Sequence, residues 1–126
     1  MISEAPGYPI ETVFAAQSGE GWRASEPGGQ KIRLFFDRQT PLSRIQLRFH
    51  EADARRTQEF VLRWASATGG PWTEILRQQW NFSPDAPIEV EDYRVNLAAV
   101  SALELEIRPD LSGNNAVASL QSWKVA

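Results

Sequence analysis

The feature that most restricts the fold of this sequence is an alternation of apolar and polar residues with a period of two. In residues 31–37, every second position is apolar, at Ile32, Leu34 and Phe36. The same spacing recurs in three further segments, residues 44–50, 59–65 and 103–108. Successive side chains of a strand point to opposite faces, so each segment is predicted to be a β-strand with one face in a core. No segment of comparable length has helical spacing.

Clusters of Gly, Pro, Asn, Asp and Ser separate these segments and predict turns. They stand at residues 26–29, 40–41, 68–71, 83–85 and 112–115. Their spacing, without any strand–helix–strand pattern, is typical of an all-β antiparallel sandwich. We therefore expect one domain over residues 1–126, with about eight strands packed in two sheets.

Two predicted strands do not keep a single phase. The apolar residues of 88–90 share one parity and those of 93–97 the other, so a β-bulge is expected near Glu91 and Asp92. Adjacent apolar residues in the segment 72–80 indicate either a second bulge or a strand buried on both faces.

The loops are predicted to gather at two ends, because antiparallel strands reverse direction at every connection. Residues 17–30, 51–57, 81–87 and 109–116 fall at one end, and residues 38–43, 68–71 and 97–101 fall at the other. The first set is longer and richer in polar and aromatic residues. Binding residues of sandwich folds usually lie on loops at one end, so we expect the binding site among the first set.

Seven residues in or beside these loops are the candidate ligand-binding residues: Trp22, Arg23, His50, Arg55, Trp80, Asn81 and Asn115. A flat indole ring can stack on the apolar face of a sugar or anchor a peptide. Arginine and amide groups can hold hydroxyl, carboxylate or phosphate groups. The alternative roles are structural: rings that close the ends of the core, surface arginines in water, and an outward histidine at a strand end.

Residues suited to catalysis or metal binding are few. The absence of cysteine excludes disulfides, thiolate metal sites and a cysteine nucleophile. The single histidine, His50, begins no zinc-protease motif, because Ala54 stands where the second histidine is needed. We expect no catalytic residue and no cofactor. A structural calcium is the one alternative, with oxygen ligands from Glu51 and Asp53, or from Asp110, Asn114 and Asn115.

The acidic residues of the last long predicted strand do not suggest a hydrolase. A paired-carboxylate mechanism needs two acids that face each other in a site. Glu104 and Glu106 instead share the outward face, where we expect them to pair with Arg33, Arg48 or Arg63 across strands.

Net charge and hydropathy limit the partners. A net charge of -3 argues against binding to nucleic acid, since such proteins usually carry a basic excess. No apolar run approaches the roughly 20 residues that cross a bilayer, so no membrane span is expected. Residues 1–16 lack the basic cluster of a signal peptide, which makes the cytoplasm the default expectation.

The order of these segments resembles a known domain family. Residues 21–25 precede the strand 30–37, a polar turn at 41–43 leads into 45–49, and 60–66, a glycine turn, 72–75 and 118–125 follow. This order resembles the discoidin, or coagulation-factor C-type, domain with its galactose-binding-like jelly roll, over residues 21–126. The disulfide that ties the termini of many extracellular members cannot form here, and Phe82 alone resembles an exposed hydrophobic spike of the membrane-binding members.

The resemblance implies a jelly-roll sandwich with a binding role. Members of that superfamily bind galactose-type sugars, phospholipid head groups or other proteins, commonly through loops at one end, and several hold a structural calcium. We therefore expect a non-catalytic module that binds carbohydrate through the first set of loops. The alternative is a protein–protein interaction or assembly domain.

Overall fold

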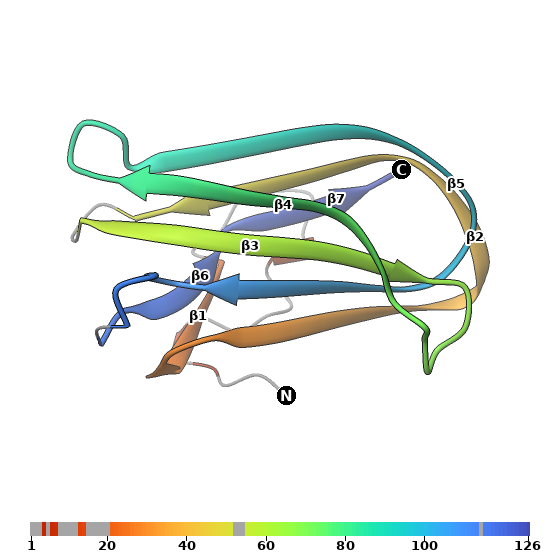
Figure 1. The fold of residues 1–126 in the computed structure, drawn as a ribbon, viewed down its shortest axis with the longest axis horizontal. Helices are drawn as coiled ribbons and strands as arrows, with labels where there is room; N and C mark the ends of the chain where they lie inside the picture. Colours follow the sequence, from red (N-terminus) through yellow and green to blue (C-terminus); the bar gives the residue numbers. More distant parts are fainter. Residues whose placement is uncertain (1–3, 5, 8–12, 15–20, 52–54, 114) are drawn as a thin grey trace.

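The described residues of the chain form seven β-strands that pair in antiparallel fashion (Figure 1). The computed structural model describes residues 4, 6–7, 13–14, 21–51, 55–113 and 115–126. The strands are β1 (Trp22–Pro27), β2 (Gln30–His50), β3 (Arg56–Ala65), β4 (Thr73–Phe82), β5 (Ile88–Arg108), β6 (Val117–Leu120) and β7 (Ser122–Val125). The described residues contain no α-helix, and none of their helical segments is long and apolar enough to cross a membrane. The all-β antiparallel prediction is confirmed.

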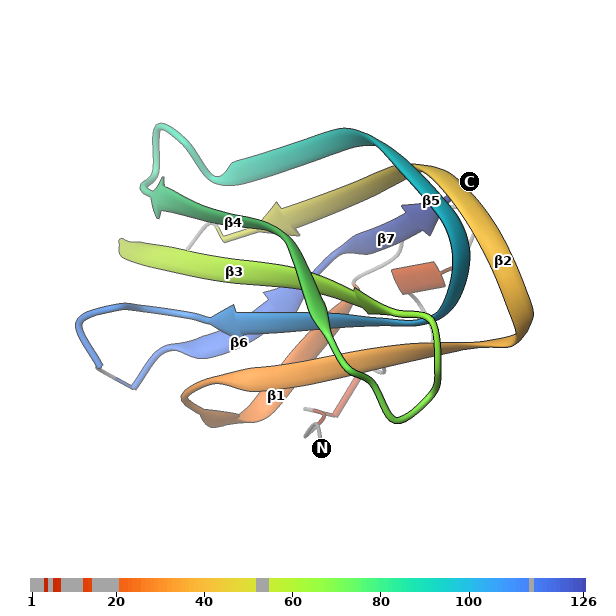
Figure 2. The same ribbon diagram turned by 45° about the vertical axis from the view of Figure 1, so that its right-hand side comes forward.

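Two strands of 21 residues, β2 and β5, pair with each other along most of their length. Their pairing runs from Gln30 opposite Ile107 to His50 opposite Ile88, with register shifts between Phe35 and Arg44. At these shifts both strands bend together, so each contributes one half to each layer of the sandwich (Figure 2). The prediction of about eight strands counted the halves separately, and residues 38–43 and 97–101 are bends within β2 and β5 rather than turns between strands.

The two layers share these bent strands. The strand order is β4-β3-β5-β2-β7, and β1 and β6 form a separate two-stranded sheet. In one layer, β3 and β4 join the second half of β5, and in the other, β7 pairs with the second half of β2. This arrangement is the predicted jelly-roll sandwich.

The core lies between the layers and is made of the predicted strand faces. Its fully buried members include the alternating residues of the four segments identified from the sequence: Ile32, Ile45, Leu47, Phe49, Phe60, Leu62, Leu103, Leu105 and Ile107. Trp64 packs against this cluster in a half-buried position, and Trp123 lies within it. The period of two therefore identified the inward faces correctly.

One of the two expected bulges is present. In β4, Leu76 pairs with Leu62 and Glu74 pairs with Arg63, so Ile75 is the extra residue of a bulge. The bulge expected near Glu91 and Asp92 is wrong.

In the first half of β5 the register is regular from residue 88 to residue 94, and it places Ile88 and Val90 outside. Ile88 and Val90 are 37% and 59% exposed, whereas Glu89 is fully buried. The prediction from the sequence placed the apolar residues of this strand end in the core, but here the apolar side chains face solvent.

The charged ladder on the outer face of the first layer is largely as expected. Glu104 accepts hydrogen bonds from Arg33 and Arg63, at 2.8 and 2.7 Å, and Glu106 accepts one from Arg63 at 2.9 Å. Arg48 takes no part and donates to Gln121 instead. The long arginine side chains cover Glu104, which is 3% exposed, so this ladder is less solvated than a typical surface pair.

Gly21 joins the N-terminal region to β1 and requires glycine for two reasons. Its φ of +80° is in the left-handed region, and an added Cβ would lie 2.5 Å from the Leu120 carbonyl oxygen. Gly21→Ala is therefore expected to lower the free energy of unfolding by about 2 to 5 kcal/mol in urea denaturation. Gly69→Ala, where a Cβ meets nothing within 4 Å, is the control and should change it by less than about 0.5 kcal/mol. Equal midpoints for the two variants would contradict the packing described for β1 against β6.

Candidate functional site

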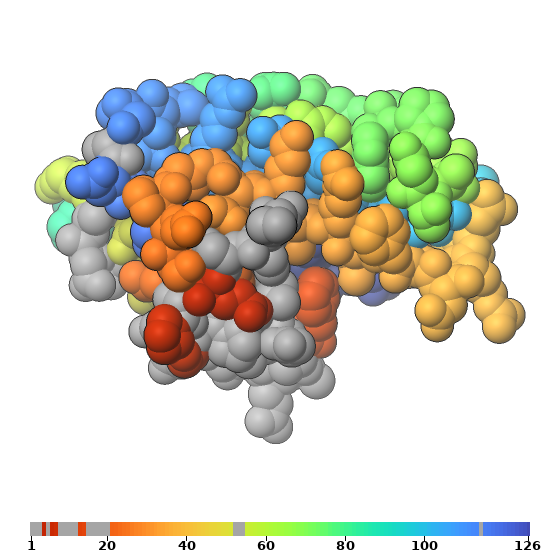
Figure 3. All heavy atoms as spheres, turned by 90° about the horizontal axis from the view of Figure 1, so that it is seen from below, coloured from red at the N-terminus to blue at the C-terminus, as the bar shows by residue number. Residues whose placement is uncertain are grey.

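The loops predicted to meet at one end do so in the structure, at the left in Figure 1. Three backbone hydrogen bonds join the four loops in series: Gly28 to Ala116 at 3.2 Å, Leu111 to Thr57 at 2.9 Å, and Glu51 to Pro87 at 2.7 Å. At the opposite end, Gln39 and Ser101 both donate to the carbonyl oxygen of Ser66. Figure 3 shows this second end, where the bend of β2 and the β3–β4 loop lie far from the loop after β5.

A pocket of about 460 Å³ opens to solvent between three of these loops. It is lined by residues 55–57 at the start of β3, residues 81–83 at the end of β4, and Asp110 and Ser112 after β5. Most of the lining side chains are polar. Because they stand at strand ends or in short loops tied by backbone hydrogen bonds, the scaffold holds them in place.

Arg56 forms the floor of the pocket and is almost completely buried. Its guanidinium donates four hydrogen bonds: to Glu51 at 2.9 Å, Gln58 at 3.1 Å, the Pro109 carbonyl at 2.8 Å and Ser119 at 3.5 Å. It also lies over the Phe82 ring, 4.7 Å from the centroid. A buried charge is tolerated only when it is paired and hydrogen-bonded, and here the partners come from four different segments. Arg56 therefore locks the floor of the pocket to the ends of the strands.

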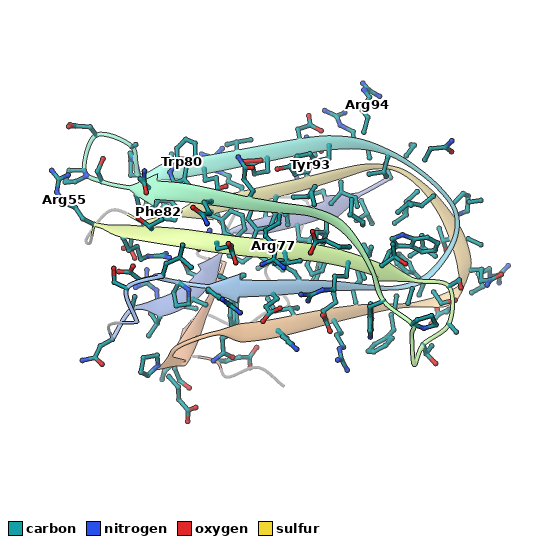
Figure 4. The ribbon with its side chains drawn as sticks, viewed as in Figure 1. Arg55, Arg77, Trp80, Phe82, Tyr93 and Arg94 are labelled. Carbon is teal, nitrogen blue, oxygen red and sulfur yellow. The ribbon has the colours of Figure 1, made fainter. Side chains whose placement is uncertain are left out.

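The rim carries groups that face solvent. The Thr57 hydroxyl donates a hydrogen bond to the side-chain amide oxygen (Oδ1) of Asn81 at 2.7 Å across β3 and β4, which leaves the side-chain amide nitrogen of Asn81 available as a donor. Asp110 accepts a hydrogen bond from the Ser112 backbone at 3.0 Å. Arg55 is exposed at the tip of this end (Figure 4).

The structure brings two of the predicted site residues together in the pocket, Arg55 and Asn81. His50 and Asn115 are exposed at the same end, but they do not line the pocket. Their interpretation as ligand-binding residues stays a prediction.

The predicted aromatic platform is corrected. Trp22 is 1% exposed and belongs to the core, because it stands at an inward position of β1, so it offers no ring for stacking. Arg23 is half-buried on β1, opposite Ser119, and does not line the pocket. Trp80 is half-buried on β4, its indole N–H donates to the Ala86 carbonyl at 3.5 Å, and its ring packs edge-on against Phe82. For Trp22, closing the end of the core is the better description, whereas the ligand-binding role of Trp80 stays a prediction.

Phe82 is not an exposed spike. It is 2% exposed, with Arg56 on its ring and Trp80 at its edge. Leu111, in the loop after β5, is an apolar residue that is exposed at this end, at 44%. Sequence reasoning did not identify Leu111, because a single apolar residue in a polar loop gives no periodic signal.

The structure does not test the calcium alternative. Asp53 and Asn114 lie outside the described residues. Glu51 is bound to Arg56, and the described part of the chain contains no group of three or more His, Asp or Glu residues that could hold a metal ion. Calcium binding stays a prediction.

Sequence reasoning missed a buried carboxylic acid whose partner, Gln58, also binds Arg56. Glu89 is fully buried, one of its oxygens accepts from Gln58 at 3.2 Å, and the other has no hydrogen-bond partner among the described residues. Burial raises the pKa of Glu89 to about 8, and the neighbouring carboxylate of Glu91 adds to this effect. Gln58 and Arg56 oppose it. Glu89 is therefore mostly protonated at neutral pH, and it can donate a hydrogen bond to Glu91.

Comparisons with known proteins identify the fold. No protein-family model matches the sequence, and no curated protein matches it significantly. Among solved structures, the CBM32 of AlyQ in complex with 4,5-unsaturated mannuronic acid is 16% identical, with 100% of this chain and 92% of that chain covered and a TM-score of 0.70. Chitosan-binding module 1 from a chitosanase/glucanase of Paenibacillus sp. IK-5 is 16% identical, with 98% and 89% covered and a TM-score of 0.71.

The N-terminal domain of the single-strand break repair protein XRCC1 is also similar. It is 12% identical, with 98% of this chain and 91% of that chain covered and a TM-score of 0.69. At such identities the similarity shows the fold alone. It confirms the predicted antiparallel jelly-roll sandwich.

The raised pKa of Glu89 predicts how stability varies with pH. The folded state keeps a proton that the unfolded chain, with an ordinary pKa of 4.5, releases. The contribution of the Glu89 proton to the free energy of unfolding is therefore complete below about pH 4.5. It falls as the pH rises to about 8, by up to about 1.4 kcal/mol per pH unit. Glu89→Gln removes this titration. The free energy of unfolding of this variant should therefore increase relative to that of the wild type between pH 5 and pH 8.

Urea denaturation at pH 5, 6.5 and 8 measures this difference. Glu26→Gln, at an exposed position on β1, is the control and should follow the wild type at all three pH values. A constant offset between Glu89→Gln and the wild type would show that Glu89 does not titrate in this range.

Proposed function

We propose that this protein is a non-catalytic carbohydrate-binding module whose site is the pocket between the β2–β3, β4–β5 and β5–β6 loops. The observation that carries the proposal is this open, largely polar pocket of about 460 Å³, built on rigid strand ends. Its size is within the range of small-ligand sites. The mannuronic acid complex and the chitosan-binding module named above share the fold, and so does a DNA-repair domain, so the pocket rather than the fold supports the ligand class.

The groups in the pocket suit a ligand rich in hydroxyl groups. Each sugar hydroxyl can donate one hydrogen bond and accept others, so it is best held by a mixture of donors and acceptors. The Asn81 amide and the Arg55 guanidinium supply donors, Asp110 supplies an acceptor, and the hydroxyls of Ser83 and Ser112 can act as either. This mixture supports binding of carbohydrate.

The distribution of carboxyl groups favours binding over hydrolysis. A glycosidase places two carboxyl groups on either side of the bond it cleaves. Of the described residues that line the pocket, Asp110 alone carries a carboxylate, and it accepts a hydrogen bond from its own loop. The neighbouring acids Glu89 and Glu91 do not line the pocket, and Glu89 is fully buried. These observations support a non-catalytic role.

Asn81→Ala tests the site. Removing the exposed amide should weaken glycan binding about three- to tenfold, because one or two hydrogen bonds to the ligand are lost. The melting temperature should change little, since Asn81 is exposed at the end of β4. Gln78→Ala is the matched control: it removes an exposed amide from the same strand outside the pocket and should leave binding unchanged.

Binding is measured first on a glycan array and then by isothermal titration calorimetry with the best glycan. Equal losses in both variants, or no loss in either, would place the ligand elsewhere. Absence of binding to any glycan would contradict the proposal. Exposed Leu111 beside the pocket would then favour a protein partner, which light scattering for a dimer and pull-down experiments can test.

A further inference from the structure

The charges that line the pocket are not equally available to a ligand. Arg56 is buried and paired with Glu51, and its other hydrogen bonds go to protein groups. Asp110 has one oxygen bound to the Ser112 backbone and a further interaction within the protein. Arg55 is exposed, and within the described part of the chain its side chain makes no hydrogen bond or ion pair. Among the charged groups that line the pocket, the Arg55 guanidinium is therefore the most available to a ligand.

The neutral groups of the rim also offer a ligand more hydrogen-bond donors than acceptors. Because the Thr57 hydroxyl already donates to the Asn81 oxygen, the amide of Asn81 presents its nitrogen, which can only donate. The Arg55 guanidinium also only donates. A rim with more free donors than free acceptors selects a ligand with more acceptors than donors. Among sugars, a carboxylate creates that excess, since it accepts hydrogen bonds and donates none.

We propose that the pocket selects acidic sugars of the uronate class, with the ligand carboxylate bound by the Arg55 guanidinium and the Asn81 amide nitrogen beside it. This inference rests on the proposed carbohydrate-binding function. The planar guanidinium fork matches a carboxylate with two parallel hydrogen bonds, a geometry that lysine cannot reproduce. The protein as a whole is acidic, with a net charge of -3, so general attraction to polyanions does not explain such a preference.

The first experiment compares uronate glycans with their esters, which lack the negative charge. Calorimetry measures binding of the wild-type protein to polygalacturonate and to its methyl ester, and to alginate and its propylene glycol ester. The acid form of at least one pair should bind about tenfold or more tightly than its ester. Equal affinity for acid and ester would overturn the uronate inference while leaving the carbohydrate proposal intact, whereas no binding to any glycan would overturn both.

The second experiment locates the charge recognition at Arg55. Arg55→Gln should weaken binding of the acid form about tenfold and bring it to the level of the ester, and Arg55→Lys should give an intermediate loss. Arg38→Gln is the matched control, because Arg38 is exposed in the bend of β2 at the opposite end. Equal effects of the Arg38 and Arg55 substitutions would indicate general electrostatics and overturn the assignment.

A sulfated glycan distinguishes carboxylate recognition from recognition of any anion. Chondroitin sulfate and unsulfated chondroitin carry the same uronate and differ in the sulfate ester. The uronate inference expects similar affinity for the two at 150 mM salt. Binding that requires the sulfate would assign the pocket to sulfate esters and overturn the inference.

Discussion

The pairing of β2 with β5 is the constraint on which the rest of this structure depends. Each strand has 21 residues, and the two remain paired before and after their common bend. A strand that bends back on itself begins and ends at the same end of the molecule. The ends of both long strands therefore meet at one pole, together with the start of β3 and the end of β4, and a pocket built from strand ends results.

Arg56 holds these strand ends together at the floor of the pocket. Its partners come from the end of β2, from β3, from the residue after β5, and from β6. Removing one member of a buried pair typically costs about 3–5 kcal/mol, because the other charge is left without compensation. The same contacts keep its side chain from moving into the pocket. The floor is thus held in place, and in the function proposed above the exposed side chains of Arg55 and Asn81 recognise the ligand.

Local pattern predicted much of this fold, and long-range contacts account for what it missed. The alternation of residues 45–49 and 60–62 identified the buried faces, and the rule of alternate ends held even where a turn proved to be a bend. The pattern failed at Glu89, which is buried and accepts a hydrogen bond from Gln58 on another strand. It also failed at Trp22, where the polarity of a loop suggested exposure although β1 faces inward. Gln58 is far from Glu89 in the sequence, and Leu120, which pairs with Trp22, is far from Trp22. Neither failure could therefore be corrected from local spacing.

The low sequence identity to structures with the same fold is explained by the different requirements of the core and of the rim. At 12% to 16% identity the TM-scores are still 0.69 to 0.71, because a sandwich requires apolar residues at every second position rather than particular ones. The rim residues Arg55, Asn81 and Ser83 are exposed or half-buried and contribute nothing to the hydrophobic core. The fold therefore places few demands on the side chains of the rim, and the rim of the proposed ligand site can vary without loss of the core.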